Sequence, residues 1–342
     1  MARRVSKRAM RVLLSAFLVF AVVTLSAQTP PAKSAIPVDP IAAILDLFKE
    51  YRVVGLGEGP HGNEQGHRFR LALIRHPRFP TLVNDIVVEM GTARYQDAMD
   101  RFVRGEAVPR SELRHFWEDT TVPGSGADRP MYEEFFTAVR DVNRSLPKDR
   151  QMRVLGGEPP IAWESVKGGA DLRRWWMQRD PHAVAVIKRE VLARNRRALV
   201  VYGDGHFQGR GFAPRSITVG LESAGEKIFT VSTSFVDLAR FQPDVATWKI
   251  PSFARLKDTL IGTQFYARFY PLPPRAGWNT VRMHDQFDGI VYMGRTMTMQ
   301  RLPKALCDDP AYMKMRLARL ALQPDQRSKP GEQFTRYCEG LK

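Results

Sequence analysis

Short apolar runs alternate with amphipathic segments along most of the chain. The β-like apolar runs are residues 52–56, 85–89, 153–155, 198–202, 228–232 and 289–293. Other segments have apolar residues at helical spacing or a composition that favours helices. They are residues 41–51, 61–75, 93–103, 132–142, 171–179 and 182–194. Strands that alternate with helices predict a mostly parallel sheet covered by helices on both faces. We therefore expect an α/β fold.

The first 27 residues have a different pattern from the rest of the chain. Five basic residues precede an uncharged apolar run at residues 12–25, which is followed by Ser26 and Ala27. This order is typical of a secretory signal peptide. An uncleaved membrane anchor is the alternative, but the run is shorter than the roughly 20 residues that span a bilayer. We expect cleavage near Ala27 and a periplasmic or secreted product without stable membrane anchoring.

The remaining chain divides by composition into three segments. Residues 28–37 are rich in Pro, Ala and Ser and predict a flexible leader. Residues 38–300 predict one α/β domain, and residues 301–342 a helical tail that packs on it. The two cysteines, Cys307 and Cys338, both lie in this tail. In an oxidising compartment they are expected to form one disulfide that pins the tail, with two free buried thiols as the alternative.

The chain is basic, with a formal net charge of +16. Removal of the signal peptide takes away five basic residues and no acidic one, which leaves +11. A basic exported protein is attracted to anionic surfaces or envelope polymers. Nucleic acid is a poor partner outside the cytoplasm, and the sequence has no recognisable nucleic-acid-binding motif. We expect a small-molecule substrate or ligand instead.

Candidate chemistry lies where four of the predicted strands end. Each strand leads through a glycine-containing turn or directly to ionisable residues, which are Glu58 with His61, Glu89, Glu158, and Asp204 with His206. In an open parallel sheet, ligands bind outside the carboxyl ends of the strands. We expect Glu58, His61, Glu89 and His206 to form an active centre, with Glu158 and Asp204 in contact with substrate.

His61 is the expected general base. It is predicted to lie where a strand gives way to a helix, and the positive end of a helix dipole disfavours imidazolium. A neutral imidazole can accept a proton from water. Glu58 or Glu89 would orient the ring, and His206 would polarise a carbonyl or assist the leaving group. Arg70, further along the same helix, would hold an anionic group of the substrate.

Three segments resemble motifs of a known family. Residues 53–62 resemble the first motif of the erythromycin esterase family, residues 87–89 its second strand, and residues 199–206 the later strand with the second histidine. The wider superfamily includes ChaN-like haem-binding lipoproteins and TIKI/TraB-type proteins, and residues 203–206 are also similar to the ChaN-like pattern. The resemblance implies functional positions, with His61 as the base, at Glu58, His61, Arg70, Glu89 and His206.

The chain also departs from that family. Gly59-Pro60 replaces the commoner Ala-Thr, and Glu158 stands where the esterases often carry Asp. A macrolide is therefore not implied as the substrate. The main hypothesis is an exported hydrolase that cleaves an ester, lactone or amide and requires no cofactor.

Three other functions are considered. Residues 57–62 also fit a dinucleotide-binding Gly-x-Gly-x-x-Gly pattern, with Glu89 ending the next strand. Pro60 removes a backbone donor there and Glu58 adds a negative charge, and nicotinamide cofactors are scarce outside the cytoplasm. A non-enzymatic ChaN-like protein would use its His and Glu side chains to bind haem or another metal-containing ligand. A metal-dependent hydrolase would hold a divalent ion with His61, Glu89 and His206.

Overall fold

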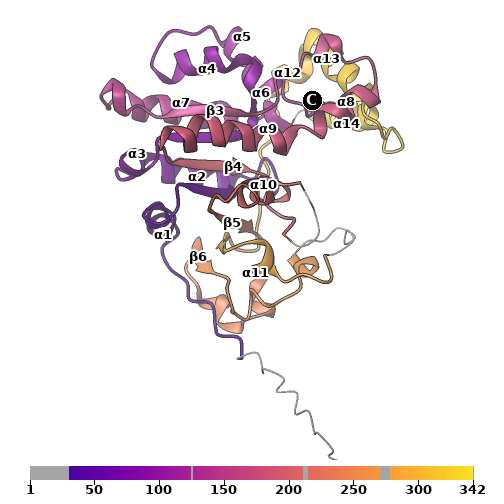
Figure 1. The fold of residues 1–342 in the computed structure, drawn as a ribbon. Helices are drawn as coiled ribbons and strands as arrows, with labels where there is room; N and C mark the ends of the chain where they lie inside the picture. Colours follow the sequence, from indigo (N-terminus) through magenta and orange to yellow (C-terminus); the bar gives the residue numbers. More distant parts are fainter. Residues whose placement is uncertain (1–30, 125, 211–214, 270–277, 342) are drawn as a thin grey trace, which may run out of the picture. The chain divides into compact units, whose positions relative to one another are not determined.

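A mostly parallel sheet organises the chain (Figure 1). In the computed structural model, which describes residues 31–124, 126–210, 215–269 and 278–341, the sheet has seven strands in the order β3-β2-β4-β1-β5-β7-β6. Each neighbouring pair is parallel except β6 and β7. The strands are β1 (Val53–Gly57), β2 (Asp85–Thr92), β3 (Arg153–Glu158), β4 (Ala198–Tyr202), β5 (Ile228–Ser234), β6 (Ser252–Arg255) and β7 (Gly289–Tyr292).

Helices connect most of the strands. They are α1 (Pro40–Leu47), α2 (Glu64–Arg75), α3 (Phe79–Leu82), α4 (Gln96–Val103), α5 (Arg110–Leu113), α6 (His115–Glu118), α7 (Pro130–Asn143), α8 (Gly169–Trp176), α9 (Arg179–Val186), α10 (Ile217–Glu222), α11 (Met283–Gln286), α12 (Lys304–Asp308), α13 (Pro310–Ala321) and α14 (Pro330–Glu339). A π-helical turn, Ile187–Val191, continues α9. Short 3-10 turns are Ala93–Tyr95, Gly126–Asp128, Lys148–Arg150, Trp163–Ser165, Leu192–Arg194, Asp204–His206, Leu238–Arg240, Pro243–Thr247 and Tyr266–Phe269.

The sheet separates two apolar cores. Successive side chains of a strand point to opposite faces, so in β1 Val54 joins one core and Val53 the other. Helices α1, α2, α4, α6 and α7 contribute to the first core, and α9 and α10 to the second. Every residue of the central strand β1 is buried. The expected α/β fold, with a mostly parallel sheet covered on both faces, is confirmed.

The expected leader, residues 28–37, is anchored at its described end. Lys33 pairs with Thr259, and Ala35 is buried and exchanges two hydrogen bonds with the side chain of Gln242. Backbone pairing of Val38 with Phe253 follows. These residues therefore lie along the edge of the sheet that β6 forms. The expected signal peptide, residues 1–27, lies outside the described residues.

The C-terminal tail contains α12, α13 and α14 around a small apolar core of its own. The expected disulfide between Cys307 and Cys338 is present, and a disulfide is consistent with a location outside the cytoplasm. Arg316 of α13 is almost fully buried and lies 2.7 Å from Asp128. The tail thus packs against the segment between α6 and α7. In the ranges that the structure describes, no helix is long and apolar enough to cross a membrane.

Two local features differ from the sequence pattern. Strand β6 was not expected, because its four residues follow a proline-containing loop and have only a short apolar pattern. The helix expected over 61–75 begins later, at Glu64, because the side chain of Asn63 accepts a hydrogen bond from the Gly66 N–H and forms the N-cap.

Candidate active site

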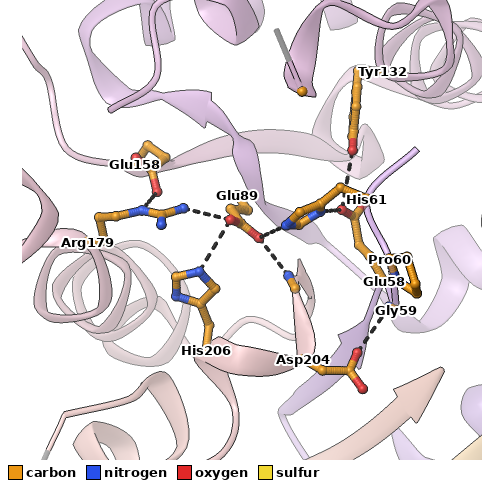
Figure 2. Close-up of polar contacts among 12 residues, drawn as sticks. Glu58, Gly59, Pro60, His61, Glu89, Tyr132, Glu158, Arg179, Asp204 and His206 are labelled. Carbon is orange, nitrogen blue, oxygen red and sulfur yellow. Dashed lines mark hydrogen bonds and ion pairs between the residues drawn. The ribbon is translucent and has the colours of Figure 1, made fainter. Parts of the chain in front are cut away.

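The four strands with ionisable ends are direct neighbours in the sheet, in the order β3-β2-β4-β1. Glu58 follows β1, Glu158 ends β3, and His206 lies in the 3-10 turn after β4. Glu89 lies within β2, where the register with β3 becomes irregular between Val88 and Thr92. Such irregularities re-aim a side chain. Glu58, His61, Glu89 and His206 therefore converge near the carboxyl ends of these strands (Figure 2).

His61 lies between two buried carboxylates. Its Nδ1 is 2.7 Å from Oε2 of Glu58, and its Nε2 is 3.6 Å from Oε2 of Glu89. The side chain of His61 is 36% exposed, whereas those of the two glutamates are nearly inaccessible. The imidazole is thus the part of the cluster that solvent or a substrate can reach.

The turn that carries His61 depends on glycine and asparagine. Gly59 and Gly62 have φ angles of 64° and 90°, which side chains other than glycine rarely adopt. The amide of Asn63 donates to the carbonyl oxygens of Glu58 and Pro60 at 2.7 and 2.6 Å. These contacts fix the backbone between β1 and α2 and hold His61 beside Glu58.

Glu89 has four polar neighbours, two of which donate hydrogen bonds to it. The Gly203 N–H donates to Oε2 at 2.6 Å, and Arg179 donates to Oε1 at 2.6 Å. His206 Nε2 lies 3.2 Å from Oε1, and His61 lies near Oε2. Burial alone would raise the pKa of Glu89, but the two imidazoles and the guanidinium lower that pKa well below its usual value. Glu89 is therefore an anion that organises the cluster.

His206 is also enclosed by acidic groups. Its Nδ1 is hydrogen-bonded to Asp180, and its Nε2 faces Glu89. Burial lowers the pKa of the imidazole, but Glu89 and Asp180 outweigh that effect and raise the pKa of His206 to about 10. The ring therefore carries a positive charge at neutral pH, and both of its nitrogens face carboxylates.

The protonation expected for His61 is wrong. Burial disfavours the imidazolium, but the charge of Glu89 and the hydrogen bond to Glu58 raise the pKa of His61 to about 9. The helix-dipole argument fails because α2 begins only at Glu64, after the cap residue Asn63. Glu58 itself has a lowered pKa, because Arg70 and His61 outweigh the opposing effect of burial.

Of the three residues expected to contact substrate, Arg70 and Glu158 point into the protein. Arg70 is buried, with Nη2 3.5 Å from Oε1 of Glu58. Glu158 is fully buried and accepts from Thr121 and Arg179. Asp204 accepts from the Gly59 N–H at 3.1 Å and from the hydroxyl of Ser232. Arg70 and Glu158 therefore position neighbours, in contrast to the expected contact with substrate, whereas Asp204 also borders the cavity beside His61.

Sequence reasoning missed Arg179, Asp180 and Tyr132. Helix α9 begins at Arg179, so its first turn places Arg179 beside Glu89 and Asp180 beside His206. The hydroxyl of Tyr132, on α7, lies 3.5 Å from Oε2 of Glu58. The sequence pattern placed Arg179 at the end of one expected helix and Asp180 in the gap before the next.

A cavity of about 500 Å³ opens beside His61. Pro60 and His61 border it on one side, and Gly203, Asp204 and Gly205 on another. Gly59, the last three residues of β5 and four further residues complete the lining, namely Gly59, Ser232, Thr233, Ser234, Phe235, Val236, Phe269 and Met297. A volume of this size accommodates a small organic molecule.

The cluster has one group of side chains compact enough to share a metal ion. In the described part of the chain, ligand atoms of Glu58, His61 and Glu89 lie within 4.8 Å of one another. The metal-dependent hydrolase hypothesis had named His61, Glu89 and His206 as ligands. The compact set contains Glu58 instead of His206.

The charges of the cluster are already balanced by protein groups. Four carboxylates face four cationic side chains: Glu58, Glu89, Glu158 and Asp180 against His61, His206, Arg70 and Arg179. A divalent cation would have to displace protons from the imidazoles, because metal-bound His is neutral. The donor set is therefore poorly suited to a resident metal ion.

Comparison with known proteins finds similarity in structure only. No family model matches the chain, and no curated protein matches it. A solved protein from Bacillus cereus has 12% identity and a TM-score of 0.48, with 79% of this chain and 97% of that chain covered. The erythromycin esterase EreC, in its open conformation, has 11% identity and a TM-score of 0.47, with 76% and 94% covered.

A haem-binding protein is also among the similar structures. ChaN of Campylobacter jejuni, solved with cofacially bound haem, has 14% identity and a TM-score of 0.39, with 59% of this chain and 89% of that chain covered. The similar structures thus include an erythromycin esterase and a ChaN protein.

Proposed function

We propose that this protein hydrolyses an ester, lactone or amide with water that His61 activates. One observation carries the proposal: His61 borders a cavity of substrate size while its Nδ1 is held at 2.7 Å by the buried Glu58. A carboxylate on one imidazole nitrogen orients the ring and stabilises the charge that the ring gains when the other nitrogen accepts a proton.

The proposed step uses only groups of the chain and water. Nε2 of neutral His61 accepts a proton from water, and the water oxygen bonds to the carbonyl carbon. The bond from that carbon to the leaving oxygen or nitrogen then breaks, and the leaving group takes the proton from His61. The products are a carboxylic acid and an alcohol or amine. Glu89, 3.6 Å from Nε2, is close enough for one water molecule to contact both groups.

His206 has a supporting role in this proposal. It does not border the cavity, and its two ring nitrogens face Glu89 and Asp180. We assign it to holding Glu89 in place, and not to polarising the substrate carbonyl. The raised pKa of His61 means that the base is available mainly in alkaline solution.

Haem or metal binding is the second candidate, because Glu58, His61 and Glu89 form the compact ligand group described above. Against a resident metal ion, the carboxylates of the cluster are already paired with cationic side chains, and a coordinated His61 would have to lose the proton that Glu58 and Glu89 stabilise. Metal analysis of protein purified from the periplasm tests this candidate. A haem titration followed by the Soret band tests it independently.

The hydrolase proposal is tested with a screen of p-nitrophenyl esters, lactones and anilides. We expect His61→Ala to lower kcat/KM at least about 100-fold, the usual contribution of a general base. His76→Ala, a histidine at the end of α2 outside the cluster, is the matched control and should retain activity. Thermal unfolding should show that both variants are folded. Full activity in His61→Ala would remove this residue from the mechanism.

A further inference from the structure

The cavity beside His61 has an uneven chemical lining. Its side nearest His61 consists of Gly59, Pro60 and residues 203–205, which belong to the turns after β1 and β4. Four other lining residues have apolar side chains, namely Phe235, Val236, Phe269 and Met297. An ester held with its carbonyl at His61 would therefore extend one of its ends among apolar groups.

The hydroxyl groups at the end of β5 are already engaged by the protein. Ser232 donates to Asp204, and Thr233 donates to the Gly57 carbonyl oxygen at 2.6 Å. The hydroxyl oxygen of Ser234 accepts from the Val236 N–H at 3.2 Å. These three residues therefore use hydrogen-bonding capacity within the protein. This part of the cavity lining is thus less polar than its serine and threonine content indicates.

Among the described lining residues, His61 is the one cationic group, and its charge is already paired within the protein. His61 and Asp204 are the ionisable side chains among the described lining residues, and no Lys or Arg is among them. His61 already faces two carboxylates. Although the whole chain has a formal charge of +16, a carboxylate or phosphate in this cavity would therefore find no uncommitted cation among the described lining residues, and burying an unpaired charge is costly.

From these observations we infer that the cavity binds the uncharged, apolar acyl chain of an ester, with the ester carbonyl directed at His61. The inference rests on the proposed function and adds the substrate class. It excludes acidic esters and phosphorylated molecules as preferred substrates. Each methylene group transferred from water to an apolar site strengthens binding by about 0.8 kcal/mol, which is about fourfold.

Binding can be measured without catalysis. We would titrate the protein calorimetrically with uncharged ketones from 2-pentanone to 2-nonanone, which resemble an ester carbonyl with an alkyl chain. The dissociation constant should fall up to about fourfold per added methylene until the cavity is full. The keto acid 7-oxooctanoate, compared with 2-octanone, should bind at least about tenfold more weakly because its carboxylate lacks a partner. Affinity that is independent of chain length, or a preference for the keto acid, would overturn the inference.

Two methionines supply a matched pair of variants. Met297 and Met299 are both 39% exposed, and of the two only Met297 borders the cavity. Met297→Asp should weaken 2-octanone binding about tenfold by placing a charge in the apolar part, whereas Met299→Asp should bind like the wild type. Equal effects of the two substitutions would show that the ketones bind elsewhere, and the inference would fail.

An activity series separates this inference from the function on which it rests. With p-nitrophenyl acetate, butyrate and hexanoate, kcat/KM of the wild type should rise with chain length, and Met297→Asp should reduce that rise. Ketone binding without hydrolysis of any ester would refute the proposed function and leave the apolar cavity intact. Hydrolysis without dependence on chain length would uphold the function and refute the acyl-chain inference.

Discussion

Nη2 of Arg179 lies 2.6 Å from Oε1 of Glu89, and the same guanidinium binds Glu158 through Nε. Glu89 and Glu158 belong to neighbouring strands and are buried, so one cation neutralises two charges that would otherwise repel. Because Glu89 also contacts His61 and His206, Arg179 indirectly fixes the geometry around both imidazoles.

Arg179→Ala should destabilise the protein strongly. Removal of one partner from a buried ion pair typically costs about 3–5 kcal/mol, because the remaining charges are left uncompensated. Urea denaturation measures this cost. Arg189→Ala, which removes an exposed ion pair with Glu190, serves as the control and should cost less than about 1 kcal/mol. A small effect of Arg179→Ala would show that Glu89 and Glu158 are stable without this cation.

The hydrolysis rate should depend on the protonation of His61. The pKa of the imidazole is raised to about 9, and only the neutral form accepts a proton. We therefore expect kcat/KM to rise with pH from 6 and to level off above about 9, after correction for spontaneous hydrolysis. Glu58→Gln should shift the midpoint to lower pH, because the substitution removes a negative charge from the ring. A midpoint near 6.5 in the wild type would contradict the geometry around Nδ1.

The stability of the protein should decrease in alkaline solution for the same reason. The pKa values of His61 and His206 are raised to about 9 and about 10, above their values in the unfolded chain. The stability that the two protonated imidazoles contribute is fully present below about pH 6.5. It is lost as the pH rises through their pKa values in the folded protein. The free energy of unfolding, measured by urea denaturation between pH 7 and 10, should fall. In His206→Asn the fall should be smaller, and an equal fall would assign the effect to other groups.

The disulfide should stabilise the tail without controlling the chemistry. Cys307 and Cys338 are 31 positions apart, and a cross-link that closes a loop of this length contributes about 3–4 kcal/mol in the chain-entropy model. The double variant Cys307→Ala, Cys338→Ala should have a lower melting temperature and nearly normal kcat at 20 °C. Neither cysteine is near His61 in the sequence or belongs to the described cavity lining. A large loss of kcat in the folded variant would instead connect the tail to the active site.

The sequence was sufficient to locate the sheet and the ionisable side chains near the carboxyl ends of its strands. Strand β1 is uniformly buried, and apolar runs of this kind identify interior parallel strands. Because the carboxyl ends of parallel strands lie on one side, Glu58, Glu89 and His206 could be placed together without a structure. The antiparallel edge strand β6 lacked such a run and was missed.

The electrostatics of the site could not be predicted in the same way. The pKa of His61 depends on whether Glu58 and Glu89 lie within a few ångströms of particular ring nitrogens, which the strand pattern does not determine. Arg179 contacts Glu89 across 90 sequence positions, through a helix start that the sequence placed differently. Partners of this kind arise from tertiary packing, so the predicted base had the right position and the wrong charge.

The close approach of β4 to the imidazole gives a last prediction. A Cβ atom at Gly203 would lie 3.0 Å from Cε1 and Nε2 of His61 and 3.2 Å from Oε2 of Glu89. The φ angle of Gly203 is −57°, which alanine adopts without backbone strain. Gly203→Ala should therefore push the ring away from Glu89 and lower kcat more than it raises KM, with little change in melting temperature. Gly168→Ala, where an added Cβ meets no atom within 4 Å, is the control. Unchanged kcat in Gly203→Ala would show that the separation of His61 from Glu89 does not matter for the reaction.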